Sequence, residues 1–358
     1  MTLMKKIRVL VIDDSALVRN ILTKGLGQDP WIEVVGSAPD VFIGRDKIIE
    51  LNPDVLTLDI EMPRMDGVEF LRRLMPQYPL PVVVVSSLTQ KGKQITIQAL
   101  EAGAVDFVPK PSSNVAEGLS QMMMELRTKV KIASTANVSI WKHKKNQTDS
   151  SATTVKAMNY SLAESTDKVI AIGASTGGTE AIARVVSDFP TNMPGVVIVQ
   201  HMPPGFTTMY AERLNRICRG EVKEAQAGDR VMPGRILLAP GDYHMCVVRS
   251  GGQYRIELNQ NSKVNGHRPS VDILFNSVAQ YAGNNSLGII LTGMGNDGAR
   301  GMKAMYDSGA YNIAQDEASS VVYGMPKVAV DSGGVNKVLS LDQITPELIR
   351  ILNQKDVI

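Results

Sequence analysis

Short runs of β-branched and aliphatic residues alternate with helical patterns along almost the whole chain. This alternation restricts the fold more than any other feature of the sequence. In the N-terminal third the apolar runs lie at residues 7–12, 31–35, 54–58, 82–85 and 106–108. Continuous apolar strands separated by helices are typical of a parallel sheet that is covered on both faces. We therefore predict a doubly wound α/β domain with five parallel strands over residues 1–127.

A second alternation begins at residue 168. Its apolar runs lie at 168–172, 196–199, 236–239, 287–291 and 311–314, and helical patterns occupy 179–187, 206–217, 271–281 and 299–307. These patterns predict a second, larger doubly wound α/β domain over residues 168–358. Between the two domains, residues 128–167 are rich in Ser, Thr, Ala, Asn and Lys, a composition typical of a flexible linker.

Charge and composition exclude several classes of protein. With 38 basic and 36 acidic residues the net charge is +2, and the only basic excess lies in the linker, so we expect no nucleic-acid partner. Cys218 and Cys246 are too few for a disulfide framework or a four-thiolate zinc site. The apolar runs are too short to span a bilayer, and Asp13-Asp14 interrupts the first run too early for a signal peptide. We expect a cytoplasmic protein that does not insert into membranes.

Acidic residues gather at the predicted strand ends of the first domain. Asp13 and Asp14 follow the first strand, Asp59 ends the third and Lys110 ends the fifth. The carboxyl ends of parallel strands meet in one crevice. Carboxylates in one pocket repel one another unless a cation lies among them, and oxygen ligands suit Mg²⁺. Asp14 or the neighbouring Ser15 could instead cap the next helix, but the joint placement of the acids and the lysine favours a pocket.

Three strings in this domain resemble the receiver domains of two-component response regulators. They are VIDDS at 11–15, LDIEMPRMDG at 58–67 and FVPKP at 107–111. The resemblance implies phosphorylation of Asp59 by a histidine kinase, with Mg²⁺ held by Asp13, Asp14 and Asp59. It also implies that Lys110 contacts the phosphoryl group. The switch hydroxyl follows the fourth strand, which makes Ser86 the first choice and Ser87 the second, and Phe107 stands where the family keeps its switch aromatic.

The second domain contains a candidate nucleophile. The string GASTGG at 173–178 matches the G-x-S-x-G pattern and places Ser175 in a turn between a strand and a helix. A helix that begins at such a turn offers backbone N–H groups to an oxyanion. A tight turn without chemistry, or a cradle for nucleotide phosphates, remains an alternative, although the spacing is not G-x-G-x-x-G.

A serine nucleophile needs a base, and the chain contains four histidines. His143 lies in the linker, and His244 opens a strand, where a hydrogen-bonded core histidine is expected. His201 follows the strand at 196–199 and so reaches the same edge of the sheet as Ser175, while His267 in a polar loop is the reserve candidate.

The base needs a group that orients it. Asp297 lies in a glycine-rich turn after the strand at 287–291, where it can orient the base or only cap a helix. The chain order Ser, His, Asp differs from that of α/β-hydrolases, so we do not expect that fold.

Further strings resemble the chemotaxis protein-glutamate methylesterase family: QHMPPGFT at 200–207, LAPG at 238–241, HRPSVD at 267–272 and QD at 315–316. The resemblance implies that Ser175 is the nucleophile, His201 the general base and Asp297 its orienter. Backbone N–H groups of Met294 and Thr176 would stabilise the oxyanion. The resemblance implies that the enzyme hydrolyses glutamate γ-methyl esters on the cytoplasmic helices of chemoreceptors. It also implies that receptor glutamines are substrates and that this domain needs no cofactor. Phosphorylation of the receiver would activate the enzyme.

Two other classes of function stay open at this point. In the first, a receiver is coupled to a non-catalytic ligand-binding α/β module, in which Ser175 and the glycine turns form a cradle. The second, a DNA-binding response regulator, is disfavoured because the output domain is nearly neutral and shows no compact helix-turn-helix pattern.

Overall fold

The computed structural model describes residues 5–63, 65–111, 115–139, 141 and 168–354. Contacts divide the chain into two compact units, unit 1 (Met1–Ala152) and unit 2 (Thr153–Ile358). Most of the predicted linker, including His143, lies outside the described residues. Helix α5 (Val115–Ala133) nevertheless continues past residue 127, and Val130 and Ala133 on it are fully buried. Residues 128–133, predicted as linker, are therefore helical, and the domain limits themselves stay predictions.

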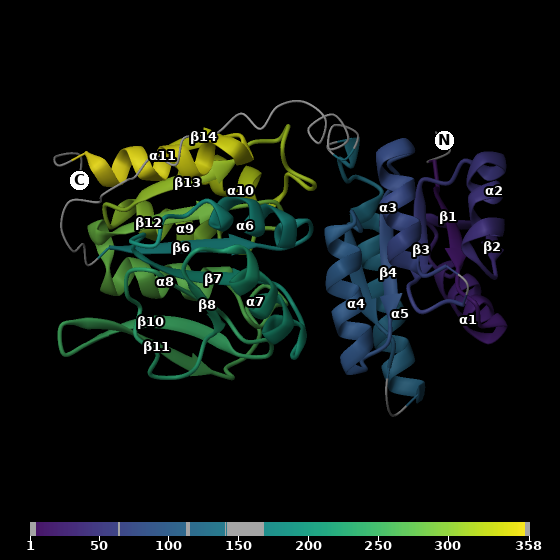
Figure 1. The fold of residues 1–358 in the computed structure, drawn as a ribbon, viewed down its shortest axis with the longest axis horizontal. Coiled ribbons are helices and arrows are strands. Elements are labelled where there is room, and N and C mark those ends of the chain that lie inside the picture. The colour runs from purple at the N-terminus through teal and green to yellow at the C-terminus, as the bar shows by residue number, and fades with distance from the viewer. Residues whose placement is uncertain (1–4, 64, 112–114, 140, 142–167, 355–358) are drawn as a thin grey trace. The chain divides into compact units, whose positions relative to one another are not determined.

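Unit 1 contains one parallel sheet of five strands in the order β2-β1-β3-β4-β5. Helices lie on both sides of this sheet, and α1 contacts α5 while α3 contacts α4 (Figure 1). The strands are β1 (Ile7–Ile12), β2 (Ile32–Ala38), β3 (Val55–Asp59), β4 (Val82–Ser86) and β5 (Asp106–Pro109). The other helices are α1 (Ala16–Leu26), α2 (Val41–Leu51), α3 (Gly67–Gln77) and α4 (Gln90–Glu101). The predicted doubly wound fold is confirmed.

Polar caps start four helices of unit 1 at the carboxyl edge of the sheet. Ser15, Asp40, Asp66 and Thr89 each accept a hydrogen bond from a backbone N–H in the first turn of the helix that follows. Such caps satisfy N–H groups that have no partner within the helix. Ser15 therefore has the capping role that the sequence left open for it, while Asp13 and Asp14 do not cap α1.

Unit 2 contains a parallel sheet of seven strands in the order β14-β13-β12-β6-β7-β9-β8, and an antiparallel hairpin of β10 and β11. The sheet strands are β6 (Val169–Ala174), β7 (Gly195–Gln200), β8 (Glu221–Glu224), β9 (Arg235–Leu238), β12 (Ser286–Ile290), β13 (Tyr311–Gln315) and β14 (Lys337–Leu339). The hairpin strands are β10 (His244–Ser250) and β11 (Gln253–Asn259). The helices are α6 (Gly178–Ser187), α7 (Phe206–Ile217), α8 (Val271–Tyr281), α9 (Ala299–Asp307), α10 (Met325–Asp331) and α11 (Leu341–Asn353), with a 3₁₀ turn at Gly283–Asn285.

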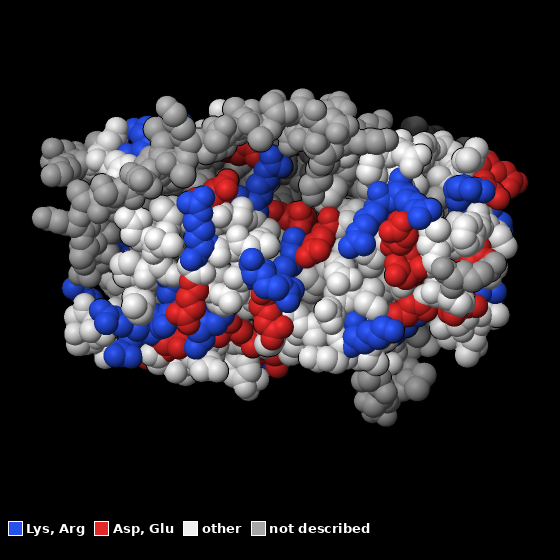
Figure 2. Space-filling view, viewed as in Figure 1, with Lys and Arg blue, Asp and Glu red and all other residues white. Residues whose placement is uncertain are grey.

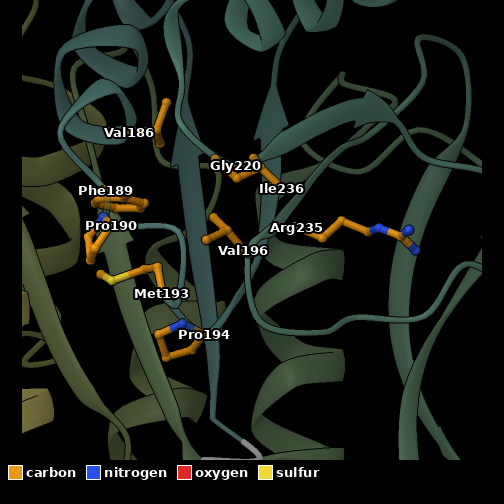
Figure 3. Close-up of a pocket in the computed structure, with 10 residues that line it drawn as sticks. Val186, Phe189, Pro190, Met193, Pro194, Val196, Gly220, Arg235 and Ile236 are labelled. Atoms are coloured by element: carbon orange, nitrogen blue, oxygen red, sulfur yellow. The ribbon is translucent and has the colours of Figure 1, made fainter. Parts of the chain in front are cut away.

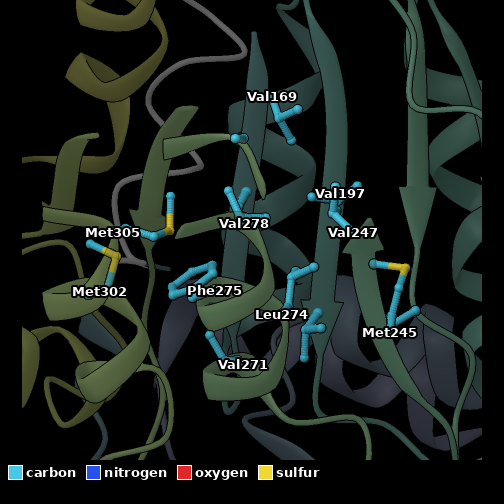
Figure 4. Close-up of a cluster of buried hydrophobic side chains, with 14 of the residues drawn as sticks. Val169, Val197, Met245, Val247, Val271, Leu274, Phe275, Val278, Met302 and Met305 are labelled. Atoms are coloured by element: carbon cyan, nitrogen blue, oxygen red, sulfur yellow. The ribbon is translucent and has the colours of Figure 1, made fainter. Parts of the chain in front are cut away.

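A large apolar cluster fills the space between the sheet of unit 2 and helix α8 (Figure 4). Val169 and Val197 contribute from the sheet, Leu274 and Phe275 from α8, and Met245 from the hairpin, all nearly inaccessible to solvent. Burial of side chains of this size contributes about 1.5–3 kcal/mol each. The cluster fixes α8, and α8 in turn fixes the loop that precedes it at the carboxyl edge of the sheet.

A small hollow lies at the opposite, amino edge of the sheet of unit 2 (Figure 3). Phe189, Pro190 and Met193 line it from the segment before β7, and Ile236 lines it from β9. Arg235 extends away from these apolar side chains and pairs with Glu221 at 2.8 Å. The hollow therefore lies away from the strand-end loops that carry the predicted site.

The charged side chains of both units are mixed in sign. On the face drawn in Figure 2, lysines and arginines lie beside aspartates and glutamates in each unit. On this face the mixture of signs agrees with the net charge of +2. Among the described helices, none combines the length and the apolar character needed to cross a bilayer.

Gly298, which precedes α9, allows a test of the packing in unit 2. Its φ is 92°, and an added Cβ would lie 2.6 Å from Val271 Cγ1. We expect Gly298→Ala to lower the free energy of unfolding of unit 2 by about 2–4 kcal/mol, through backbone strain and overpacking. Trp31 and Trp141 both lie in unit 1, so tryptophan fluorescence follows the unfolding of unit 1 alone. Circular dichroism follows both units, and the transition that fluorescence does not show is the unfolding of unit 2.

Gly333 provides the matched control, because its φ is 69° and nothing lies within 4 Å of an added Cβ. Gly333→Ala should cost only the backbone term, about 1 kcal/mol. Equal losses in the two variants would contradict the packing argument.

Candidate active site

Ser175 lies in the turn between β6 and α6. Its backbone N–H donates to Thr292 O at 3.0 Å, and its carbonyl accepts from Gly178 N at 2.7 Å. Gly177 has a φ of 75°, which favours glycine in this tight turn. An added Cβ at Gly293 would lie 2.8 Å from Ser175 Cβ, so the loop after β12 approaches the serine closely because it carries a glycine there.

His201 follows β7 and lies between Ser175 and Asp297. Its Nδ1 is 3.1 Å from Ser175 Oγ, and its Nε2 is 2.8 Å from Asp297 Oδ2. An ionised carboxylate can only accept, so Nε2 carries the hydrogen and Nδ1 presents its lone pair to the serine hydroxyl. The structure thus brings the three predicted side chains into one hydrogen-bonded row, in which the imidazole can accept the serine proton.

Asp297 is 2% exposed and is surrounded by donors. Besides His201, it accepts from Asn265 Nδ2, Ser270 Oγ and the backbone N–H of Val271, each at 2.7 Å. Burial acts to raise the pKa of this carboxyl, but the bonds from His201, Asn265 and Ser270 outweigh it and hold the pKa well below the usual range. Asp297 therefore stays ionised at neutral pH. Because its pKa is lowered on folding, its contribution to stability is present above the unfolded-state pKa and is lost as the pH falls through the folded value.

The other candidate histidines lie in different places. The imidazole of His267 stacks on that of His201, with ring centroids 3.7 Å apart and planes 8° from parallel. His267, the reserve candidate, thus covers one face of the His201 ring, while His201 itself makes the contact with Ser175. His244 is 1% exposed in β10, and its Nε2 bonds Ser262 O at 3.1 Å, as expected for a hydrogen-bonded core histidine.

The oxyanion candidates lie on the two loops beside Ser175. The N–H groups of Ser175 and Gly293 already donate to Thr292 O and Val322 O. Within the described part of the chain no acceptor bonds the Met294 N–H, so this group is available to a substrate oxygen. The Met294 side chain is 47% exposed, whereas Thr176 is buried and its carbonyl accepts from Thr292 Oγ1 at 3.0 Å.

Unit 1 carries a second candidate site at the carboxyl edge of its own sheet. One oxygen each from Asp13, Asp14 and Asp59 lie within 4.8 Å of one another, with Asp13 and Asp59 buried. Lys110 Nζ bonds Asp59 Oδ2 at 2.7 Å and Asp13 Oδ2 at 3.1 Å.

Electrostatics show that this pocket is suited to a cation. Burial, with a smaller contribution from Asp59, raises the pKa of Asp13 in spite of Lys110. Burial acts to lower the pKa of Lys110, but Asp59 and Asp13 together raise it, so the lysine stays charged. Three carboxylates carry more negative charge than one lysine neutralises, and all the ligand atoms that they offer are oxygens. Such a site fits Mg²⁺.

The two serines after β4 differ in environment. Ser86 is fully buried and its Oγ accepts from Thr96 Oγ1 at 2.7 Å, whereas Ser87 is partly exposed and its Oγ lies 3.0 Å from Thr89 Oγ1. Phe107 is 3% exposed, and Lys129 Nζ lies 5.1 Å from the centre of its ring.

Sequence reasoning missed the residues that support Ser175, His201 and Asp297. Asn265 and Ser270 bond Asp297, Thr292 holds the backbone of Ser175, and Gln200 bonds the carbonyls of Ser175 and His201. Gln200 and Thr292 stand at or just beyond strand ends, and this position was a usable signal. Asn265 and Ser270 lie in a loop whose path the sequence does not reveal.

Comparisons with known proteins show the family of the chain. The family model described as CheB methylesterase matches residues 170–348, and that described as response regulator receiver domain matches residues 9–123. A protein-glutamate methylesterase/protein-glutamine glutaminase of Syntrophotalea carbinolica is 63% identical over 99% of both chains, and one of Salmonella typhimurium is 52% identical over 97% of both. The CheB methylesterase catalytic domain of Thermotoga maritima has a TM-score of 0.51 and 38% identity, covering 52% of this chain and all of that one. The chain belongs to the CheB methylesterase family and carries a response regulator receiver domain at its N-terminal end.

Proposed function

We propose that the chain is a protein-glutamate methylesterase of chemotaxis, which hydrolyses γ-methyl esters of glutamate on the cytoplasmic helices of chemoreceptors. The observation that carries the proposal is the row of Ser175, His201 and Asp297, with contacts of 3.1 Å and 2.8 Å. The names of the relatives support a protein-glutamate methylesterase activity and add a protein-glutamine glutaminase activity. A non-catalytic binding module is not favoured, because it gives no reason for an ionised aspartate bound to a histidine that faces a serine.

The reaction follows from the hydrogen-bond directions. Ser175 Oγ attacks the ester carbonyl carbon while His201 Nδ1 takes the hydroxyl proton, and Asp297 stabilises the imidazolium that forms. The N–H of Met294, with that of Thr176, would bind the oxyanion. Collapse of the intermediate breaks the bond to the methoxy group, which takes the proton from His201 and leaves as methanol. Water then attacks the acyl-enzyme with the same base and releases the glutamate carboxylate.

The same site can accept glutamine, because the amide differs from the ester only in the leaving group. The proton from His201 would then go to the amide nitrogen, and ammonia would leave in place of methanol. The product is again a glutamate carboxylate, in agreement with the second activity in the names of the relatives.

Regulation is assigned to unit 1. A chemotaxis histidine kinase would phosphorylate Asp59. The protein would act in the cytoplasm. Asp13, Asp14 and Asp59 would hold Mg²⁺, which supplies positive charge that neutralises the entering phosphoryl group. Lys110 would contact its oxygens, and a hydroxyl, Ser86 before Ser87, together with Phe107 would change position in response. Unit 2 is proposed to work without a cofactor.

The three catalytic residues act as a unit, so their substitutions should not be additive. We expect Ser175→Ala, His201→Gln and the double variant each to lower kcat by a similar factor, about a thousandfold or more. Asp297→Asn should also lower kcat, because the amide no longer fixes the tautomer of His201. The assay is methanol release from methylated receptor membranes, with His244→Gln as a control. Near-normal turnover by Ser175→Ala would rule out the nucleophile.

Inhibition of unit 2 by unphosphorylated unit 1 can be tested by removing unit 1. Because both units belong to one chain, unit 1 stays at a high effective concentration for unit 2, which makes inhibition within one chain effective. We expect a fragment that begins near residue 150 to release methanol faster than the unphosphorylated full chain. Asp59→Asn should keep the basal rate and ignore acetyl phosphate. If the fragment is no faster than the full chain, unit 1 does not inhibit unit 2, and phosphorylation activates the enzyme directly.

A further inference from the structure

Gln200, the last residue of β7, lies directly behind the nucleophile and the base. Its side chain is buried, and its Nε2 donates to Ser175 O at 2.9 Å and to His201 O at 3.3 Å. The mechanism above does not use this side chain. It nevertheless contacts the backbone of both residues whose side chains must meet at 3.1 Å.

The position of this amide in the strand ladder explains what it does. The ladder between β6 and β7 reaches Ala174 and Gln200, and the last backbone bond across it runs from His201 N to Ala174 O at 3.2 Å. Beyond that point the two strands separate: β6 continues into the turn of Ser175, and β7 continues into the loop of His201. The side chain of Gln200 supplies the next bond between them, where the backbone can no longer do so.

The orientation of the amide is determined by its surroundings. Two carbonyl oxygens face one end, and only the NH₂ group can donate to both. The Oε1 atom at the other end is buried and has no hydrogen-bond partner in the described part of the chain. It lies against the first residue of α6, where an added Cβ at Gly178 would collide with it. If the amide were flipped, Oε1 would face two carbonyl oxygens and repel them. The observed orientation keeps both bonds to Ser175 and His201 but leaves Oε1 without a donor, which costs free energy.

We propose that Gln200 is a positioning residue for the esterase reaction, which sets the separation of Ser175 and His201 through their backbone carbonyls. This inference rests on the proposed function for its substrate, but it concerns the reactivity of the serine itself. A displacement of about 1 Å at such a pair can cost about a hundredfold in rate. Loss of the bridge should therefore lower kcat more than it changes substrate binding.

Asn312 in β13 is a matched control in the same unit. It is fully buried, its Nδ2 donates to Met302 O and Gly334 O at 2.8 Å each, and its Oδ1 is unpaired among the described residues. An added Cβ at Gly288 would collide with that Oδ1, as at Gly178. Asn312 thus repeats the chemistry of Gln200, but it bridges α9 and a loop that contain none of the catalytic residues.

The experiment compares Gln200→Met with Asn312→Leu in the full chain activated by acetyl phosphate. Both variants remove a bridging amide and keep a side chain of similar size. We expect both to lower the melting temperature by similar amounts. Only Gln200→Met should lower kcat for methanol release, by about tenfold or more with KM within about twofold, and slow the labelling of Ser175 by a fluorophosphonate.

Gln200→Glu covers the case in which Gln200→Met does not fold. It keeps the shape but turns a carboxylate oxygen toward the two carbonyls, so we expect kcat to fall at least as far. Values of kcat within about twofold of wild type in the folded Gln200 variants would overturn the proposal, as would an equal fall in Asn312→Leu. If the wild-type chain releases no methanol, the proposed function fails, and the labelling rates decide the role of Gln200.

Discussion

The buried carboxylate of Asp297 is the interaction on which the candidate active site depends. A charge taken out of water costs several kcal/mol unless hydrogen bonds replace its hydration. Here the donors come from two segments of the chain: Asn265, Ser270 and Val271 belong to the loop before α8 and its first residue, and His201 follows β7. The ionised group therefore fixes the loop before α8 and the imidazole at the same time. The apolar cluster between α8 and the sheet holds α8, and with it the loop that carries three of these donors, in place.

Much of the fold and the chemical centre could be predicted from the sequence because both follow from strand ends. The helices at Phe206–Ile217, Val271–Tyr281 and Ala299–Asp307 have the predicted limits, and the predicted sheet strands are present with small shifts at their ends. Ser175, His201 and Asp297 each follow an apolar strand, and parallel strands end at one edge. The strands β8 and β14 were missed because they are short and partly exposed.

The supporting bonds could not be predicted for a different reason. Asn265 reaches Asp297 across 32 positions of sequence, and its loop has no periodic pattern that would reveal its path. Gln200 reads as the end of a buried strand, and only coordinates show its amide turned toward two carbonyls. The choice between Ser86 and Ser87 also stays open, because it concerns a response to phosphorylation. Strand periodicity thus locates chemical groups, whereas the bonds that orient them depend on side-chain contacts far apart in sequence.

The outer strands of the larger sheet have a consequence for the enzyme in a crowded cell. The sheet of seven strands ends in two edge strands, β14 and β8, and the backbone N–H and C=O groups of an edge strand can pair with another copy. Here β8 has four residues, with its Glu221 paired to Arg235 and its Lys223 to Asp229, and β14 has three residues and pairs its Lys337 with Glu347. Short edge strands with charged side chains disfavour pairing between the sheets of two copies of the protein. The catalytic unit can therefore be concentrated around its substrates without assembling into continuous sheets.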